Sequence, residues 1–169
     1  LIDASTQLTT HTGLDLLCQL LETILSRHDA AVSDAIAMSG LQMVHSHLAE
    51  TISMAALNES GRHLSHTECC VQLETKETML TAAILAGLAS PHGGGLTESC
   101  AHAIATMCSV HRGFAKAVIL VPCMKYYADY VPERFNTIAK ALSLRETTVA
   151  SFFDWLKFLD FCAIYQLTL

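Results

Sequence analysis

The sequence predicts an all-α fold, a helical bundle of about seven helices that forms a single domain over residues 1–169. Apolar residues recur with helical spacing nearly throughout, and alternating strand-like runs are almost absent. Because 51% of the residues are hydrophobic and only 15% are charged, the chain can bury one sizeable core. The mean hydropathy of +0.38 is high for a soluble monomer, so we expect both an enclosed helix and apolar surface left for a partner.

The first three helices are predicted from apolar stripes and their flanking residues. Thr12 can cap a first helix and Ser33 a second. Residues 58–66 carry a glycine and several polar residues, so a long loop is expected there. Apolar residues at helical spacing over 79–88 then give a third helix, which Pro91 stops.

Glycine and proline divide the second half of the chain. The three consecutive glycines at residues 93–95 are expected to form a loop, because each glycine destabilises a helix by about 1 kcal/mol relative to alanine. Pro122 should break or kink the helix that contains it, whereas Pro132 suits the first position of a helix. Helices are expected over residues 96–108, 114–130, 132–142 and 147–164.

Composition argues against several classes of protein. The formal charge is −6 and the 10 Lys and Arg residues are scattered, so no basic stripe for nucleic acid is present. Apolar runs are too short or carry charges, so no membrane span is expected. The chain starts at Leu1 without the features of a signal peptide, and we expect it to be a fragment. Seven cysteines without a CxxC pair indicate reduced, core-packing thiols of a cytosolic protein.

One polar stripe on the first helix is a candidate for a functional site. Asp15, Gln19 and Glu22 are spaced so that they share one face of that helix. Spacing alone favours a solvated helix face for this stripe. No nucleophile-elbow, Walker or dinucleotide-binding glycine motif is found, so nothing supports a hydrolase or a phosphate-binding loop.

A second candidate follows the glycine triplet. Glu98 and His102 form an i, i+4 pair, and His111 comes one short loop later. Carboxylate plus imidazole is a reasonable ligand set for zinc or ferrous iron. For the pair alone, an exposed Glu with a hydrogen-bonded His is the favoured interpretation. A further cluster matches no closed tetrahedral pattern and is not favoured: His63, His66, Cys69 and Cys70.

Six segments match, in order, the sequence patterns of one known family. Residues 12–22 are similar to T-G-x-D-A-L-x-H-A-I-E, 33–38 to S-D-A-L-A-L, 74–89 to E-x-R-E-x-M-L-x-A-S-L-L-A-G-L-A, 98–105 to H-A-L-A-H-P-L-G, 115–122 to A-N-A-I-L-L-P, and 132–142 to P-E-R-Y-x-x-I-A-x-A-L. Together they resemble the C-terminal helical domain of the iron-containing (group III) alcohol dehydrogenases. The resemblance covers nearly the whole chain and implies the fold of that domain.

The resemblance also implies which residues form the site, since family members hold a metal with one Asp and three His. Asp15 matches the Asp, and Gln19 and Glu98 stand where the first two His are expected. His111 is the candidate for the last ligand. His102 matches a non-ligand His beside the nicotinamide, so it is the implied catalytic and cofactor-binding residue.

This implied ligand set differs from that of the family at two positions. A neutral Gln amide is a weaker donor than imidazole, and Glu98 adds a negative charge. Three alternatives stay open for an oxygen-rich set of this kind. It would hold iron or zinc as its divalent metal, it would prefer manganese or magnesium, or it would bind no metal.

The function implied is that of the C-terminal domain of a metal-dependent, NAD(P)-linked alcohol dehydrogenase. The metal would polarise the oxygen of a small alcohol or aldehyde for hydride transfer. An N-terminal nucleotide-binding domain, absent from this chain, would bind most of the dinucleotide, and the parent protein would be a cytoplasmic homo-oligomer. The alternative is a degenerate, metal-free homologue that serves as a structural or oligomerising module. Alone, the chain should expose an apolar patch, self-associate and lack turnover.

Overall fold

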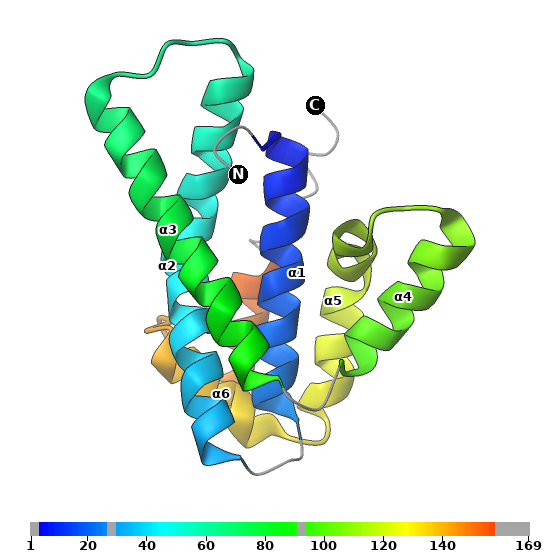
Figure 1. Cartoon of the computed structure of the whole chain (residues 1–169). Helices are drawn as coiled ribbons and strands as arrows, with labels where there is room; N and C mark the ends of the chain where they lie inside the picture. Colours follow the sequence, from blue (N-terminus) through cyan, green and yellow to red (C-terminus); the bar gives the residue numbers. More distant parts are fainter. Residues whose placement is uncertain (1–3, 27–29, 91–93, 158–169) are drawn as a thin grey trace.

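The protein is a bundle of helices, and the computed structural model describes residues 4–26, 30–90 and 94–157 (Figure 1). Residues 149–157 are the described part of a last helix, and no β-strand occurs within these ranges. The predicted all-α fold is confirmed. The other helices are α1 (Thr6–Leu25), α2 (Ala31–Glu59), α3 (His66–Ala89), α4 (Leu96–Cys108), α5 (Arg112–Ala128) and α6 (Pro132–Ala141).

Helix α1 is the enclosed helix that the hydropathy predicted. It contacts all five other labelled helices, with α2 and α3 on one side and α4 and α5 on the other (Figure 1). Its apolar residues are buried around most of the helix circumference, so that α1 forms the centre of the core. Side chains of α1 that are at most 2% exposed include Leu14, Leu17, Leu20 and Leu21.

Two glycines allow neighbouring helices to approach α1 closely. A Cβ atom at Gly13 would lie 2.2 Å from Cδ1 of Leu48 on α2. A Cβ atom at Gly113, at the start of α5, would lie 2.2 Å from the carbonyl oxygen of His11 on α1. The first clash is with the end of a side chain, which can move, but the second is with backbone. Gly113 therefore fixes how closely α5 lies against α1.

The last helix closes the core beside α6 and α2. Phe152 packs edge-on against Phe135 of α6, with ring centroids 4.9 Å apart. Nε1 of Trp155 donates a hydrogen bond of 2.9 Å to Nδ1 of His45 on α2. Burial lowers the pKa of the His45 imidazole, which must stay neutral at Nδ1 to accept this bond.

The first helices begin earlier than predicted. Helix α1 starts at Thr6, where Ser5 is the N-cap, and Thr12 lies inside it. The hydroxyls of Thr10 and Thr12 donate to the carbonyls four residues earlier, Thr10 to that of Thr6 at 2.8 Å, so both residues are accommodated inside the helix. Helix α2 starts before Ser33. The expected long loop shrinks because a capping box at the start of α3 extends that helix back to residue 66.

The later boundaries agree better with the prediction. Helix α4 spans the predicted residues, and Pro132 occupies the first turn of α6. Pro122 does not break α5, which continues through it. Proline removes the bond to the carbonyl of Val118, and this residue is 53% exposed, so water can replace the missing donor. The predicted end of the last helix, residues 158–164, lies outside the described residues.

The cysteines are only partly as predicted. All six that the structure describes are unpaired thiols. Cys18 and Cys123 are buried, but Cys69, Cys70 and Cys108 are exposed, so the expectation of core-packing thiols is wrong for these three. They lie in the first turns of α3 and at the end of α4, where no other described helix covers them. Cys162 lies outside the described residues.

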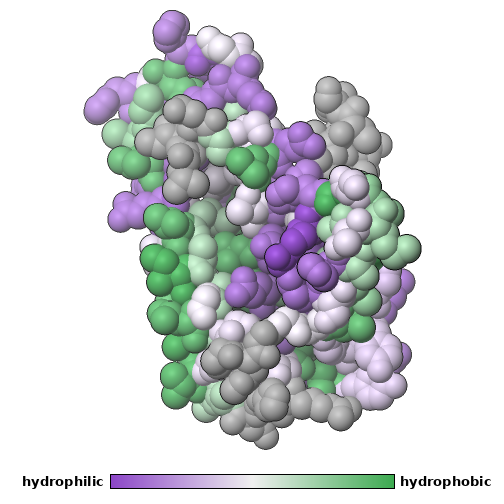
Figure 2. Space-filling view, turned by 45° about the vertical axis from the view of Figure 1, so that its right-hand side comes forward, coloured by the Kyte–Doolittle hydropathy of each residue, from purple (hydrophilic) through white to green (hydrophobic). Residues whose placement is uncertain are grey.

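An apolar patch is exposed on the outer face of α3. This α3 stripe consists of residues that are 51–64% exposed: Leu73, Leu80, Ile84 and Leu88. Figure 2 shows hydrophobic side chains along the left flank of the molecule, whereas hydrophilic ones gather in the middle of that view. Within the described ranges, no helix combines the length and apolar character needed to cross a bilayer. The predicted self-association remains a prediction.

Candidate functional site

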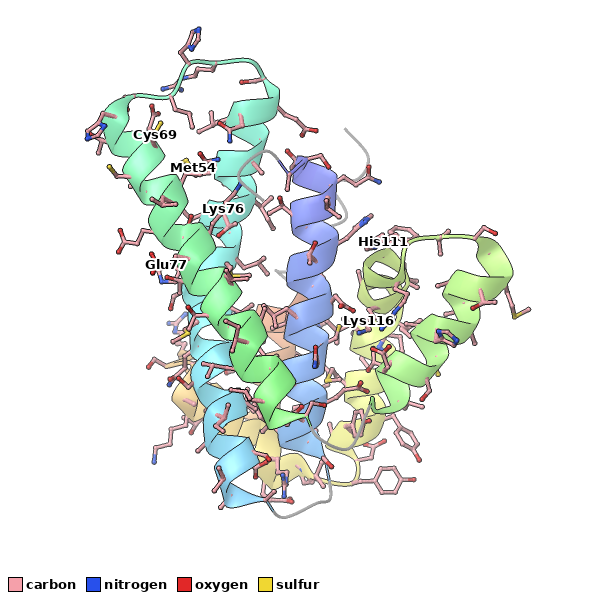
Figure 3. The ribbon with its side chains drawn as sticks, viewed as in Figure 1. Met54, Cys69, Lys76, Glu77, His111 and Lys116 are labelled. Carbon is pink, nitrogen blue, oxygen red and sulfur yellow. The ribbon has the colours of Figure 1, made fainter. Side chains whose placement is uncertain are left out.

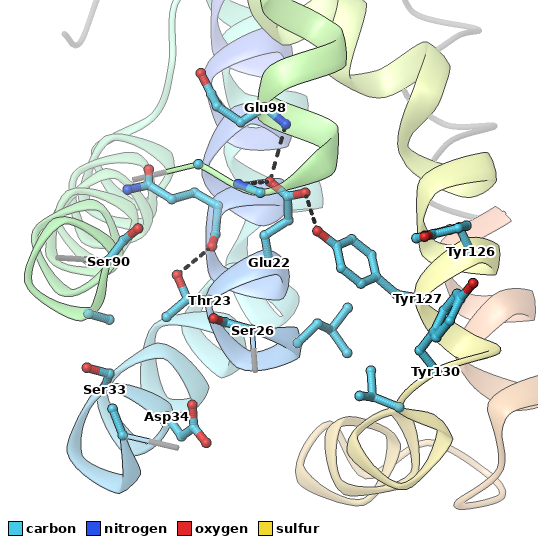
Figure 4. Close-up of a pocket in the computed structure, with 17 residues that line it drawn as sticks. Glu22, Thr23, Ser26, Ser33, Asp34, Ser90, Glu98, Tyr126, Tyr127 and Tyr130 are labelled. Carbon is cyan, nitrogen blue, oxygen red and sulfur yellow. Dashed lines mark hydrogen bonds between the residues drawn. The ribbon is translucent and has the colours of Figure 1, made fainter. Parts of the chain in front are cut away.

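Glu22 of α1 holds the start of α4. Its carboxylate accepts hydrogen bonds from the backbone N–H groups of Gly95 at 3.1 Å, Thr97 at 2.5 Å and Glu98 at 3.3 Å (Figure 4). The first backbone N–H groups of a helix have no acceptor within that helix, and the helix dipole favours an anion at this end. Glu22 is thus the N-terminal cap of α4, supplied by another helix. It is 8% exposed, so the predicted solvated face is wrong for this residue because α4 covers it.

Tyr127 of α5 completes this cap. Its hydroxyl donates to Oε1 of Glu22 at 3.2 Å and accepts from the backbone N–H of Leu96 at 2.9 Å. Burial, together with the nearby charge of Glu22, raises the pKa of Tyr127 to about 12. The phenol therefore stays protonated and remains a donor. A Cβ atom at Gly95 would lie 2.6 Å from Oε1 of Glu22, so the last glycine of the triplet leaves room for the carboxylate.

A cluster of charged residues lies where α1, α4 and α5 meet. Lys116 of α5 is 2% exposed, and its ammonium group pairs with the carboxylates of Asp15 on α1 and Glu98 on α4. Figure 3 shows Lys116 in the space between these helices. Arg112, on the first turn of α5, pairs with the other oxygen of Glu98. Burial alone would lower the pKa of Lys116, but the two carboxylates outweigh it and raise the pKa above its usual value.

A cleft with a volume of about 480 Å³ lies beside the charged cluster, and Gln19 and Glu98 both line it. The volume suits a small ligand. Nε2 of Gln19 makes a long contact of 3.5 Å to the carbonyl of Ala86 on α3. Polar and apolar side chains both line the wall, and Tyr126, Tyr127 and Tyr130 lie together on one side of it (Figure 4). Lining residues include Glu22, Ser90, Asp34, Tyr126, Tyr127 and Tyr130.

His111 and His11 contact each other at the start of α5. His111 is the N-cap of α5, where its Nδ1 accepts a 3.1 Å hydrogen bond from Gly113. Its ring stacks on that of buried His11, with centroids 4.9 Å apart. Burial and the neighbouring His111 lower the pKa of His11. His102 is exposed on α4, one turn after Glu98.

The side chains do not fit the metal that the resemblance implies. Two of the four implied ligands, Asp15 and Glu98, are both paired with the ammonium group of Lys116. The side chain of Gln19 is turned to a backbone carbonyl, and one ring nitrogen of His111 is engaged by α5. In the part of the chain that the structure describes, no three His, Cys, Asp or Glu residues are grouped to hold a metal ion.

Sequence reasoning missed three residues of this region, namely Lys116, Arg112 and Tyr127. Lys116 carried a usable signal, because it stands between Ala115 and Ala117 in the apolar run of the fifth helix. A lysine is almost never fully buried without a partner. Its position thus predicts an acidic partner but does not say which one.

The sequence of this helical domain matches the model of one protein family. The model of the C-terminal domain of the Fe-containing alcohol dehydrogenase family matches residues 9–159. This match covers most of the chain, and the chain belongs to that family.

The relatives that the chain matches are longer enzymes. It is 28% identical over 142 residues to an NADPH-dependent butanol dehydrogenase of Clostridium saccharobutylicum, covering 84% of this chain and 32% of the relative. It is 26% identical over 136 residues to a 1,3-propanediol dehydrogenase of Klebsiella pneumoniae, covering 80% of this chain and 31% of the relative. This chain thus spans about a third of the length of these relatives.

Solved structures agree on the fold. The alcohol dehydrogenase from Oenococcus oeni superposes with a TM-score of 0.79 at 21% identity, over 96% of this chain and 40% of that one. At this identity the likeness shows the fold alone. The implied helical domain is therefore confirmed.

Proposed function

We propose that this chain is the substrate-side helical domain of an NAD(P)-linked oxidoreductase that interconverts small alcohols and aldehydes. The match to the family over residues 9–159 carries the proposal. The relatives are named for butanol and 1,3-propanediol, which are small alcohols. Because the chain spans about a third of those relatives, the dinucleotide would be bound mainly by a nucleotide-binding domain outside this sequence.

The cleft beside Gln19 and Glu98 would bind the small alcohol or aldehyde. Its wall includes an amide, hydroxyls and carboxylates that can orient an oxygen of the substrate. Exposed His102 on α4 would contact the nicotinamide, as the resemblance implies. Hydride transfer requires the two carbons to be held about 3 to 3.5 Å apart, which one wall of a cleft cannot achieve alone. The residues of this site would act without a metal, because the side chains do not fit one.

A fusion protein tests this proposal. The nucleotide-binding domain of the 1,3-propanediol dehydrogenase would be joined to this chain, and NAD(P)H absorbance at 340 nm followed with short aldehydes. We expect turnover that requires both halves and falls in the His102→Ala variant. The isolated chain and the isolated nucleotide domain are the controls. A folded fusion that binds NAD(P)H but does not turn over any short alcohol or aldehyde would refute the proposal, and turnover by the isolated chain would refute the need for a second domain.

A second candidate function is a structural or oligomerising module without catalysis. The ion pairs of Lys116 with Asp15 and Glu98 favour it, since they engage two implied ligands in a packing contact between helices. The α3 stripe offers apolar surface for a partner. Sedimentation of the chain at several concentrations, beside the fusion assay, separates the two: an inactive, folded fusion together with a self-associating chain would support the module.

A further inference from the structure

Lys116 lies where an ion shared by Asp15 and Glu98 would have to bind. Its side chain is 2% exposed and reaches both carboxylates, one from α1 and one from α4. The carboxylates are themselves only partly exposed, at 36% and 27%. An ion held between them would meet the ammonium group at the same position.

The charges of the cluster balance without any added ion. Asp15 and Glu98 carry two negative charges, and Lys116 and Arg112 carry two positive ones. Each oxygen of Glu98 has its own cation, Oε1 that of Arg112 and Oε2 that of Lys116. Two side chains of α5 thus provide the charge that a divalent cation would otherwise bring.

The neighbouring groups do not offer a replacement ligand set. Gln19 is neutral, and its amide nitrogen contacts the carbonyl of Ala86. His111 accepts the N–H of Gly113 through Nδ1, and its ring stacks on that of His11. Among the described residues, no three His, Cys, Asp or Glu residues are grouped to hold a metal ion. A metal would therefore have to displace Lys116 and would gain mainly two oxygen ligands.

From this geometry we infer that Lys116, assisted by Arg112, is the resident cation of the site, and that the domain keeps its fold and its α1–α4–α5 junction without a divalent metal. Lys116 excludes the ion by occupying both carboxylates and by repelling a second positive charge. This inference concerns the ion alone and holds whether or not the chain serves an oxidoreductase. Removing the ammonium group of Lys116 should create a binding site for a divalent cation that the native chain lacks.

The test compares the chain with its Lys116→Met variant after removal of metals by a chelator. Mn²⁺ is the probe, because the freed ligands are carboxylate oxygens. A thiol and an imidazole, Cys70 Sγ and His66 Nε2, lie 3.9 Å apart on the outside of α3 and would capture softer ions such as zinc. The concentration of free Mn²⁺ is read from its electron paramagnetic resonance signal, and thermal unfolding is followed in parallel.

We expect the native chain to bind no stoichiometric Mn²⁺ and to unfold at the same temperature in chelator and in Mn²⁺. The Lys116→Met variant should bind Mn²⁺ about a hundredfold more tightly than the native chain, which is the scale of the repulsion removed. Its melting temperature should rise with Mn²⁺, and Asp15→Asn added to this variant should abolish that rise. Lys116→Arg keeps a cation and is the matched control, which should behave as the native chain does.

Two results would overturn the inference. One is stoichiometric Mn²⁺ on the native chain that is lost in Asp15→Asn. The other is a folded Lys116→Met variant whose Mn²⁺ affinity does not rise. If Lys116→Met fails to fold, the native chain decides: a melting temperature independent of Mn²⁺ supports a resident ammonium, and a rise that Asp15→Asn removes refutes it. Neither readout depends on catalysis, so failure of the proposed oxidoreductase would not be mistaken for failure of this inference.

Discussion

The two sides of α1 are built from different interactions. Toward α2 the contacts along the middle of α1 are apolar, with Gly13 against Leu48 and Leu20 against Gly40. At the start of α1, the backbone N–H of Thr6 donates to Glu59 of α2. Toward α4 and α5 the contacts are charged, with Glu22 on the start of α4 and Asp15 on Lys116. Apolar burial stabilises the bundle but is not directional, whereas hydrogen bonds to a carboxylate fix one position. Burial therefore holds α1 in the core, and a few polar groups set the position of α4.

The largest effect should come from forcing α5 away from the charged side of α1. In Gly113→Ala, the new Cβ atom meets the carbonyl oxygen of His11 at 2.2 Å, so a helix must move. We expect a loss of about 3 kcal/mol in the free energy of unfolding, at the upper end for overpacking because the obstacle is backbone. Urea denaturation followed by circular dichroism measures it.

Gly87→Ala is the matched control for that change, since its Cβ atom would meet no atom within 4 Å. Alanine should here stabilise α3 by about 0.5 to 1 kcal/mol, because glycine is the poorer helix former. Equal effects of the two substitutions would show that the approach of α5 to α1 is not as close as described.

A smaller loss is expected when the cap of α4 is weakened. Glu22→Gln keeps the shape of the side chain but removes the charge that accepts three backbone N–H groups. We expect a loss of about 2 kcal/mol, the range for hydrogen bonds to a charged group. Exposed Glu50→Gln on α2 should change stability by less than about 0.5 kcal/mol. Similar values for the two variants would mean that burial alone positions α4.

The smallest effect concerns an uncharged polar contact away from the charged side. The lowered pKa of His45 means that the folded chain holds this proton less well than the unfolded chain, whose imidazole titrates near 6.5. This contribution to stability is present above that pH and is lost as the pH falls through the folded-state pKa. The lost bond is worth about 1 kcal/mol.

The fluorescence of Trp155, the single tryptophan, reports this titration directly. Its emission should change below pH 6.5 as the bond to His45 breaks. His45→Gln keeps an acceptor that does not titrate, and this variant should flatten the profile. A profile that persists in this variant would assign the transition to another group.

The sequence predicted the elements better than the contacts between them. Apolar spacing and Pro132 indicated the helices, and α4 was predicted with its observed bounds. The stripe of Asp15, Gln19 and Glu22 was correctly placed on one helix, but its partners come from residues 67 to 105 positions later. Periodicity shows which way a side chain faces along its own helix. It contains no information on which lysine or backbone N–H group of another helix will meet that side chain.

The way in which α4 is held has a consequence for local unfolding. Only Thr97 and Ala101 of this helix are buried, so little apolar surface becomes exposed to solvent when α4 detaches. Regions with few buried contacts open at a lower free energy than the rest of a protein, and their amide hydrogens exchange faster. Helix α4 should therefore form its own cooperative unit, which exchanges before α1 does. Its amides would become accessible together when the hydrogen bonds from the start of α4 to Glu22 break. The helix would then open as a flap while the rest of the bundle stays folded.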